Sequence, residues 1–543
     1  MKKILLNIII LLTCTFALSG NAASKNKETY EYLDLFGQIF DRVRSGYVEE
    51  VTDEELIEKA IDGMLTGLDP HSGYMNEEVW QEMQTDTKGK FGGLGIEITM
   101  EEGFVKVISP IEDTPAYEAG VKAGDYIIQI DETPVFGLSL NEAVDLMRGK
   151  KGSPIIITIS REGVDPFEIK IIRDIIKIQS VKSDIFNDIG YLRITSFTEQ
   201  TESGLIKSIK KIKEDLNNKE IGYILDLRSN PGGLLKQAVK VTDIFLERGE
   251  IVSTRGRKKI DMQRYQAKSG DLIDKKPLIV IINGGSASAS EIVAAALQDH
   301  GRAIVVGGKM THGKGTVQQI LPLNRSFIAN LDKDSGQLKF TISKFYRING
   351  ATTQRDGVKP DIILPSVFDY LGMSEAELPR ALESDEIEKA KYKSLDRVEA
   401  FFTSLRKAST KRINGDQDYK YIREDITRAK KQKEDRSVSL NESERRQERA
   451  DNKTRIEARN KERADRAAQS EKYFEIDVKL AEAGKPLKKL DPPKPKKQNP
   501  DPNAIPEDDS STFRFDPELR ETLQILSDFV KLNSKLISQI KKN

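Results

Sequence analysis

Short apolar runs alternate with amphipathic stretches between residues 189 and 307. Apolar runs of strand length occupy 221–227, 278–282 and 303–306, and stretches with helical spacing occupy 203–213 and 234–246. A run that is apolar on both faces is typical of a strand buried between helices. Alternation of such strands with helices predicts a layered α/β domain, which we place at 169–365.

Helical spacing of apolar residues marks both ends of the chain. Residues 26–84 are predicted to be helical. Residues 366–543 are dense in charged residues and are also predicted to be helical, but an apolar periodicity returns only at 513–540. We expect this last helix to dock on another part of the protein, because its apolar face needs cover. A solvated or partly disordered helix is expected near 440–470, and a linker at 491–511.

The first residues have the pattern of a targeting segment. Two lysines precede an apolar stretch from Ile4 to Leu18, and small residues follow near Ala22. This pattern predicts a cleaved signal peptide at 1–22, and hence an exported, periplasmic protein. An uncleaved anchor, which would make the protein membrane-associated, and a lipoprotein signal at Cys14 are the alternatives. No later stretch is long and apolar enough to cross a membrane.

Composition narrows the classes of function. The chain has 543 residues, and its 86 Lys and Arg balance 86 Asp and Glu, so no basic field indicates nucleic acid. One cysteine and three histidines are too few for a zinc site built from these ligands, and no HExxH motif is present. We therefore expect neither a metal nor a cofactor.

The stretch from Leu278 to Gln318 carries the candidate chemistry. A strand, an Asn-Gly-Gly turn and three alternate serines lead into an Ala-rich helix, and a glycine-rich loop with Lys314 follows the next strand. A serine at such a turn can be a nucleophile whose oxyanion is held by N–H groups at the helix N-terminus. Ser288 also fits an N-cap in a capping box with Glu291, and one residue can do both. The lysine favours catalysis, because a neutral, desolvated Lys can replace His as the base.

The segments SASASE, ALQD and GKGTVQ in this stretch resemble the carboxyl-terminal processing proteases, which are Ser/Lys peptidases. The resemblance implies that Ser288 is the nucleophile, that Lys314 is the general base and that Gln318 orients the lysine. It also implies that N–H groups of Ala289 and of the Gly232–Gly233 pair in NPGG hold the oxyanion. The segments LDPHSGYM and TQRDGVKPDI extend the resemblance along the chain.

One loop departs from the family pattern. The segment GGKMTHGK, which ends at Lys314, is one residue longer than usual, with His312 where an aromatic residue is common. The extra residue has to bulge if Lys314 is to reach Ser288. A Ser/His peptidase that uses His312 or His300 is therefore an alternative. We interpret His71, which lies in a Pro-His-Ser turn, as structural.

The glycine-rich sequence FGGLGI at 91–96 resembles the carboxylate-binding loop of PDZ domains. The segment GDYIIQID and a helix predicted at 140–148 follow in the order of that family, so we predict a PDZ domain at 88–168. Consecutive N–H groups in such a loop bind the C-terminal carboxylate of a peptide, which then pairs beside the next strand. The residues expected to bind it are Gly93, Leu94, Gly95 and Ile96. The alternative is that these glycines form a hairpin turn only.

These patterns together predict a multidomain α+β protein. Its parts are a helical N-terminal segment, a PDZ domain, a layered α/β Ser/Lys protease core and a charged helical C-terminal domain similar to that of the tail-specific proteases. The expected substrates are proteins or peptides with free C-termini, and the pattern leaves room for an adaptor protein as a partner. A catalytically inactive PDZ scaffold is one alternative. A P-loop nucleotide hydrolase is another, but Gly315 stands where a Ser or Thr must bind Mg²⁺.

Overall fold

The computed structural model describes residues 28–101, 103–111, 113–161, 163–268, 270–323, 336–392, 394–435, 439–469 and 516–540. The expected signal peptide at 1–22 and the expected linker at 491–511 lie outside the described residues. The chain divides into two compact units, one of 1–80 with 318–341 and one of 81–317 with 342–543.

The first unit begins with helices, as the sequence predicts. It contains a helix at 28–46, helix α2 (Asp53–Thr66), the start of α3 (Glu77–Lys88) and strand β1 (Gly73–Met75). A capping box starts α2: Thr52 Oγ1 accepts from the Glu55 N–H at 3.2 Å, and the Glu55 carboxylate accepts from the Thr52 N–H at 3.0 Å. β1 pairs antiparallel with the first residues of β18 (Gln337–Tyr346).

The second unit opens with the antiparallel sheet expected of a PDZ domain. Its strands are β3 (Ile96–Glu101), β4 (Phe104–Pro110), β5 (Tyr126–Ile130), β6 (Thr133–Pro134), β7 (Pro154–Arg161) and β8 (Val164–Ile172), with helices α4 (Pro115–Glu118) and α5 (Leu140–Met147). Val107, Ile127 and Ile157 are fully buried in the core between this sheet and its helices. β2 (Lys90–Gly93), which precedes the glycine-rich loop, pairs instead with β9 (Asp174–Lys177).

A six-stranded sheet forms the centre of the second unit. Its order is β10 (Val181–Phe186), β11 (Ile189–Ile194), β12 (Gly222–Asp226), β15 (Leu278–Ile282), β16 (Ile304–Gly307) and β19 (Ile362–Ile363). All neighbours are parallel except β10 and β11. Every residue of β12, β15 and β16 is buried, which confirms that the three apolar runs in the sequence are central strands.

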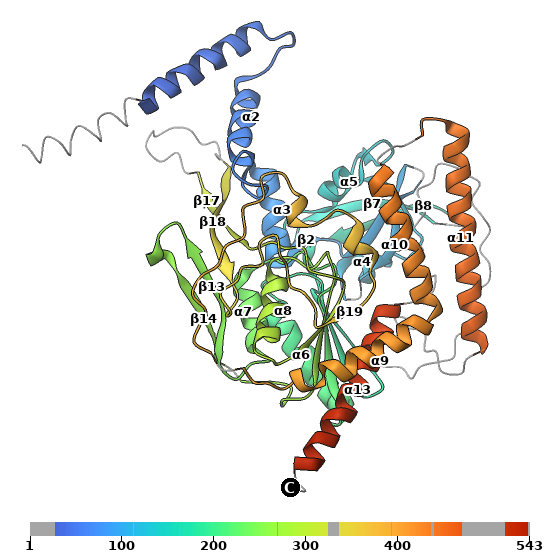
Figure 1. The fold of residues 1–543 in the computed structure, drawn as a ribbon. Helices are drawn as coiled ribbons and strands as arrows, with labels where there is room; N and C mark the ends of the chain where they lie inside the picture. The colour runs from blue at the N-terminus through green and yellow to red at the C-terminus, as the bar shows by residue number, and fades with distance from the viewer. Residues whose placement is uncertain are drawn as a thin grey trace, which may run out of the picture. The chain divides into compact units, whose positions relative to one another are not determined.

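Helices cover both faces of this central sheet (Figure 1). On one face lie α6 (Thr201–Asp215), α7 (Leu235–Asp243) and α8 (Ala289–Asp299), and on the other lie α9 (Phe402–Gly415) and α13 (Pro517–Ile540). Alternate strand residues point to opposite faces, so Val280 packs toward α8 while Ile279 and Ile281 pack toward α13. The expected docking of the last helix is therefore confirmed, and its partner is the sheet itself.

The remaining elements belong to the second unit, except that β17 continues from residue 318 into the first unit. They are β13 (Gly249–Gly256), β14 (Gln263–Ala267), β17 (Thr316–Pro322), the single 3₁₀ turns η1 (Lys259–Asp261), η2 (Val367–Tyr370), η3 (Glu375–Glu377) and η4 (Glu399–Phe401), and helices α10 (Gln417–Asp435) and α11 (Glu442–Gln469). α11 is a solvated helix, as expected for the charged stretch, but it is also tied to α10. Arg463 and Arg466 of α11 bind the fully buried carboxylate of Asp418 at 2.9 and 2.7 Å.

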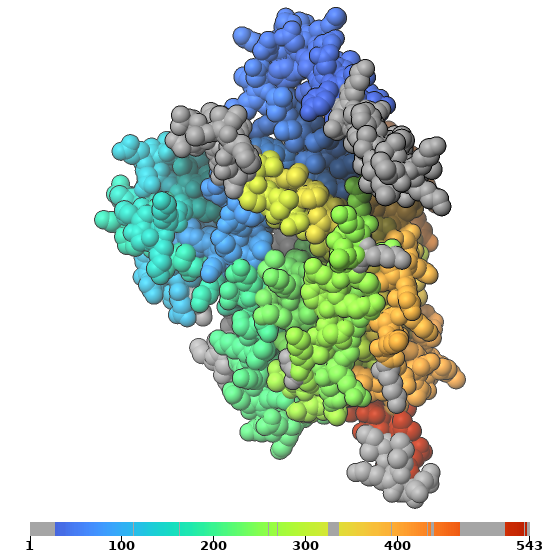
Figure 2. Space-filling model, turned by 90° about the vertical axis from the view of Figure 1, so that its left-hand side faces the viewer, coloured from blue at the N-terminus to red at the C-terminus, as the bar shows by residue number. Residues whose placement is uncertain are grey.

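A segment without regular structure, residues 387–392 and 394–397, runs along the surface of the second unit. Its backbone is held by N–H groups of Ala390 and Leu395, which donate to Ile348 O and His300 O, each at 2.8 Å. Figure 2 shows orange atoms, the colour of residues near 400, beside the green atoms of residues near 300. The segment helps to bury His300, whose ring meets that of Tyr392 edge-on with 5.7 Å between centroids.

None of the helices in the described part of the chain has both the length and the apolar character of a membrane span.

Candidate active site

Three alternate serines follow β15, and they differ in their hydrogen bonds and in their exposure. The hydroxyl of Ser286 donates to Leu227 O at 2.8 Å, and that of Ser290 donates to Asn230 O at 2.9 Å. Both of these serines are fully buried, whereas Ser288 is partly exposed. Ser288 also has a φ of 54°, a region that non-glycine residues rarely occupy. A strained serine at the start of a helix, presented between two anchored serines, has the features of a nucleophile at a strand-to-helix turn.

The carboxylate of Glu291 joins the serine turn to the lysine loop. One oxygen, Oε2, accepts from the N–H groups of Ser288 at 2.7 Å and Lys314 at 3.0 Å. The other, Oε1, accepts from the Gly313 N–H at 2.8 Å and the Thr311 hydroxyl at 2.5 Å. Glu291 thus makes the capping contact that the sequence predicted and three more that it did not. Burial raises the pKa of Glu291 to about 7, against the lowering effect of these hydrogen bonds.

The backbone of the lysine loop is fixed on both sides of Lys314. Thr353 donates its hydroxyl to Lys314 O at 3.1 Å, and the Arg355 N–H donates to Gly313 O at 2.7 Å. Gly313 adopts a φ of 94°, which only glycine adopts without strain. These contacts hold the longer loop in one backbone conformation.

The Gly232–Gly233 pair lies against the serine turn. A Cβ placed on Gly232 would lie 2.9 Å from the Ser288 Cβ and 3.0 Å from the Ala289 N, so only glycine fits there. The N–H of Gly232 already donates to Asn230 Oδ1 at 2.9 Å. Among the described residues, no acceptor is found for the N–H groups of Gly233 and Ala289. Of the three residues expected to donate to the oxyanion, Gly233 and Ala289 have N–H groups that fit the role. Gly232 instead leaves room for the serine turn because it has no side chain.

Asn230 is a site residue that the sequence analysis missed. Its carbonyl accepts from both the Ala287 N–H and the Ser290 hydroxyl, each at 2.9 Å, and its side-chain nitrogen donates to Ile194 O at 2.9 Å. It therefore fixes the glycine turn to the serine turn. The sequence offered only the general tendency of Asn to form local turns before Pro-Gly, which does not identify these long-range partners.

The histidines have partners of their own. His312 Nε2 lies 3.3 Å from the buried Glu375 carboxylate, and this interaction raises the pKa of His312. His300 is buried, with Nε2 at 2.8 Å from Glu250 O. In the first unit, the N–H of His71 donates to Asp69 Oδ1 at 2.9 Å, which accounts for the turn. The contacts of His300 and His312 thus involve partners other than Ser288, and the Ser/His pair stays an alternative to the Ser/Lys pair.

Gln318 belongs to the first unit, and its side chain contacts a residue of that unit. Its side-chain amide donates to Thr341 Oγ1 at 3.1 Å, and Thr341 Oγ1 in turn donates to Asp69 Oδ1 at 3.1 Å. Asp69 also accepts from Ser72 Oγ at 2.7 Å. These contacts connect Gln318 to the turn of the LDPHSGYM segment, while its expected action on the lysine stays a prediction.

The glycine-rich loop of the PDZ sheet has its carbonyl groups bound within the domain. Leu94 O accepts from the Ala116 N–H at 2.9 Å, and Gly95 O accepts from the Ile111 N–H at 2.9 Å. A trans peptide plane points its N–H away from its C=O, so the N–H groups of Gly95 and Ile96 both point away from those partners. Gly95 has a φ of 80°, and a Cβ there would lie 2.3 Å from Thr114. Two successive N–H groups would suit a carboxylate if they converge on it, which stays a prediction for this loop.

No group of three or more His, Cys, Asp or Glu side chains arranged to hold a metal ion is found in the described part of the chain.

Comparisons with known proteins agree with this geometry. The sequence matches the family model of Peptidase family S41 at residues 188–364. The Carboxy-terminal-processing protease of Bartonella bacilliformis is 53% identical over 359 residues, which cover 65% of this chain and 80% of that protein. The chain belongs to the carboxy-terminal-processing proteases of peptidase family S41. It is therefore a serine-type peptidase, and its α/β core, PDZ domain and helical C-terminal region are those that the sequence predicted.

Other matches place this S41 peptidase within the family. Carboxy-terminal processing protease CtpA of Bacillus subtilis is 32% identical over 365 residues, covering 66% of this chain and 75% of that protein. A probable CtpA-like serine protease of Staphylococcus epidermidis is 35% identical over 364 residues, covering 66% of this chain and 71% of that protein. Further family models match a PDZ domain at 106–161, the C-terminal domain of tail specific protease (DUF3340) at 368–531 and the activating protease CtpB N-terminal domain at 15–79.

Proposed function

We propose that this S41 peptidase cleaves peptide bonds with Ser288 as nucleophile and Lys314 as general base. The observation that carries the proposal is the carboxylate of Glu291, because its Oε2 accepts from the backbone N–H groups of both residues. Two residues whose N–H groups meet at one oxygen are neighbours in space, although they lie on different loops. The φ of 54° at Ser288 adds to this, since strain of this kind is found where a side chain must be presented.

We propose the following steps for this pair. Neutral Lys314 takes the hydroxyl proton of Ser288 as Oγ attacks the carbonyl carbon of the scissile bond, and the resulting oxyanion is held by the N–H groups of Ala289 and Gly233. The proton passes to the leaving amine as the C–N bond breaks, which leaves an acyl-enzyme. Water, deprotonated by the lysine, then hydrolyses the ester and restores the serine. Gln318 is proposed to orient the lysine, as the resemblance implies.

Substrate selection is proposed to begin at the PDZ domain. A protein or peptide with a free C-terminus places its carboxylate at the loop of Gly93, Leu94, Gly95 and Ile96, and its last residues add as a strand beside β3. Because such a site recognises a chain end, it selects substrates by their termini rather than by internal sequence.

The test is cleavage of an unfolded protein with an apolar free C-terminus, without ATP or metal. Wild type should cleave it, while Ser288→Ala and Lys314→Ala should each lose activity by about 10³-fold or more, as loss of a nucleophile or base does. His312→Ala is the matched control and should retain most activity. Loss in His312→Ala with retention in Lys314→Ala would establish a Ser/His pair, and an inert wild type that still binds the peptide would establish a PDZ-bearing scaffold.

We also propose that the protein is exported, with residues 1–22 as the signal peptide, and acts in the periplasm. The lysines and the apolar stretch at the start of the sequence support this. Mass spectrometry of the N-terminus from a periplasmic extract should find a chain that begins after Ala22. A chain that retains Met1 and sediments with membranes would show that the segment is an anchor.

A further inference from the structure

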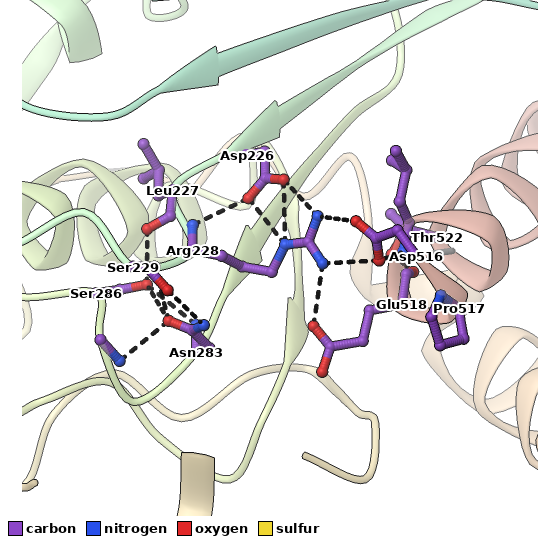
Figure 3. Close-up of polar contacts among 12 residues, drawn as sticks. Asp226, Leu227, Arg228, Ser229, Asn283, Ser286, Asp516, Pro517, Glu518 and Thr522 are labelled. Carbon is purple, nitrogen blue, oxygen red and sulfur yellow. Dashed lines mark hydrogen bonds and ion pairs between the residues drawn. The ribbon is translucent and has the colours of Figure 1, made fainter. Parts of the chain in front are cut away.

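Arg228 lies at the centre of a buried group of charges, two residues after the end of β12. Figure 3 shows its guanidinium facing three carboxylates. Nη2 donates to Asp226 Oδ2 at 2.6 Å, and Nε donates to Asp226 Oδ1 at 3.0 Å. On its outer side, Nη1 and Nη2 donate to Asp516 at 2.9 and 2.6 Å, and Nη1 also donates to Glu518 at 3.1 Å. The side chain of Arg228 is only 10% exposed.

The two outer carboxylates belong to the start of the C-terminal helix α13. Asp516 is 288 residues from Arg228 along the chain, yet the two form a bidentate pair. Asp516 Oδ1 also accepts from the Leu519 N–H at 2.9 Å, so the same side chain caps α13. The arginine therefore fixes the N-terminus of this helix as well as being fixed by it.

Arg228 is also the first residue of the turn that leads to Gly233. The residues on both sides of it are bound to the serine segment: Ser286 Oγ donates to Leu227 O at 2.8 Å, and the Ser229 N–H donates to Asn283 Oδ1 at 2.8 Å. Ser229 itself has a φ of 54°, a strained conformation that its surroundings must impose. A displacement of the Arg228 backbone is therefore passed directly to the glycine turn and the serine turn.

We propose that Asp516 and Glu518 are positioning residues of the peptidase site: through Arg228 they fix the backbone that presents the Gly233 N–H to the oxyanion. This inference rests on the proposed function and extends it, since it gives the C-terminal helix α13 a role in positioning the catalytic centre. The two residues touch neither substrate nor the reacting atoms.

The burial of these charges explains why the contact holds Arg228 in place, unlike an exposed ion pair. A guanidinium taken out of water needs acceptors for its N–H groups, and a buried charge that loses its partner is strongly unfavourable. Asp226 occupies the inner edge of Arg228, so without Asp516 and Glu518 the group Nη1 would lose the partners described above. The arginine would then turn toward water, and the strained turn that begins at Ser229 would lose the support of Arg228 and keep its contacts with Asn283. Exposed ion pairs elsewhere on the protein lack this consequence.

The test removes charge and keeps shape. In Asp516→Asn/Glu518→Gln, Asn still caps α13, so the helix is expected to stay folded. Glu521→Gln is the matched control: Glu521 is also on α13 and binds Arg412 at 2.7 Å, but it does not touch Arg228. The readouts are kcat and KM on a peptide with a free C-terminus, the rate at which a fluorophosphonate probe labels Ser288, and the melting temperature.

The double variant should lose about tenfold to a hundredfold in both kcat and labelling rate, the effect of a small misplacement in an active site. Its KM should change little, because the PDZ loop captures the peptide. Glu521→Gln should keep wild-type kcat and labelling, even where its melting temperature falls as far. Equal kcat and labelling in the double variant and wild type would overturn the inference, and so would an equal loss in the control.

Failure of the inference is distinguishable from failure of the proposed function. If Ser288→Ala is inactive while the double variant is as active as wild type, the Ser/Lys mechanism stands and the positioning role falls. If Ser288→Ala keeps activity, the proposed function itself falls. The single variant Asp516→Asn gives a graded result in case the double variant does not fold, and it should show a smaller loss of the same kind.

Discussion

Glu291 is the residue at which the serine and lysine segments converge. A carboxylate with four donors would ordinarily be ionised, yet burial raises the pKa of Glu291 to about 7. The residue is therefore close to taking up a proton near neutral pH. Since the folded state binds that proton more tightly than the unfolded chain, this group contributes stability below its unfolded pKa, and the contribution is lost as the pH rises through about 7.

The first prediction concerns this pH dependence. The free energy of unfolding of wild type, relative to Glu291→Gln, should be greater at about pH 4.5 than at about pH 8 by roughly 3 kcal/mol. At every pH the variant should also be less active. The amide of Gln has only one acceptor oxygen, so it cannot accept from all the N–H groups of the serine and lysine segments that Glu291 binds. Chemical denaturation at several pH values measures the difference.

Glu55→Gln is the control for the Glu291 prediction. Glu55 closes the capping box of α2 but is exposed, and its hydrogen bonds with Thr52 lower its pKa. Its replacement should leave the pH dependence between about pH 5 and 8 as in wild type. Equal pH dependence in Glu291→Gln and wild type would contradict the assignment to Glu291.

At the scale of elements, the glycine-rich loop, α4 and β3 act together. The loop is shaped by bonds to its carbonyl groups from Ala116 at the start of α4 and from Ile111 after β4. These bonds decide which side its N–H groups face, so the binding geometry is a property of the elements rather than of any side chain. Gly95 is the one position in the loop where a positive φ and a close approach to Thr114 both require glycine.

The second prediction concerns the substrate terminus. A peptide with a free C-terminal carboxylate should have a lower KM than its amide by about tenfold to a hundredfold, since hydrogen bonds to a charged group contribute roughly 1.5–3 kcal/mol. Steady-state kinetics on the matched pair measures this. In Gly95→Ala the difference between the two peptides should disappear. Equal turnover of acid and amide by wild type would remove the role of the loop.

At the scale of the whole molecule, the chain closes its central sheet with its last described helix. α13 packs Leu526 and Phe529, which are 0% and 3% exposed, on the face formed by Ile224 and Ile281. A Cβ on Gly222 would meet the Leu526 side chain at 3.2 Å, so helix and strand are in close contact. Arg412 binds both Glu521 and Asp528 of α13, at 2.7 and 2.6 Å. The sheet thus depends on a segment that is remote in sequence.

The third prediction tests this dependence. Leu526→Ala should lower the free energy of unfolding by about 2–5 kcal/mol, as loss of a buried leucine does. Leu536, further along α13, is 39% exposed, and Leu536→Ala should change stability by no more than about 0.5 kcal/mol. Urea denaturation of the two variants provides the comparison. Similar losses in both would mean that α13 packs differently.

Much of this organisation follows from local sequence. Uninterrupted apolar runs predicted β12, β15 and β16, because a strand buried on both faces leaves no polar alternation. Turn residues and serine spacing allowed Ser288 to be either a nucleophile or a helix cap, and the resemblance to the processing proteases indicated the nucleophile. Local sequence could not predict that Asn230 accepts a hydrogen bond from the Gly232 N–H, or that Glu291 binds the lysine loop, because those partners are brought together only by the fold.

The place of the last helix was also beyond prediction. Its apolar periodicity showed that it must dock, but nothing in it identifies the sheet face, and Asp516 reads as an ordinary helix cap. Its pairing with Arg228 depends on the sheet bringing two distant segments to one edge.

The packing of α13 has a consequence for folding. The strands of the central sheet precede α13 in the chain, so the part of the sheet face that Leu526 and Phe529 cover stays open until residues 517–540 have folded onto it. Exposed apolar surface favours association between chains, so folding intermediates that lack a docked α13 are expected to be prone to aggregation.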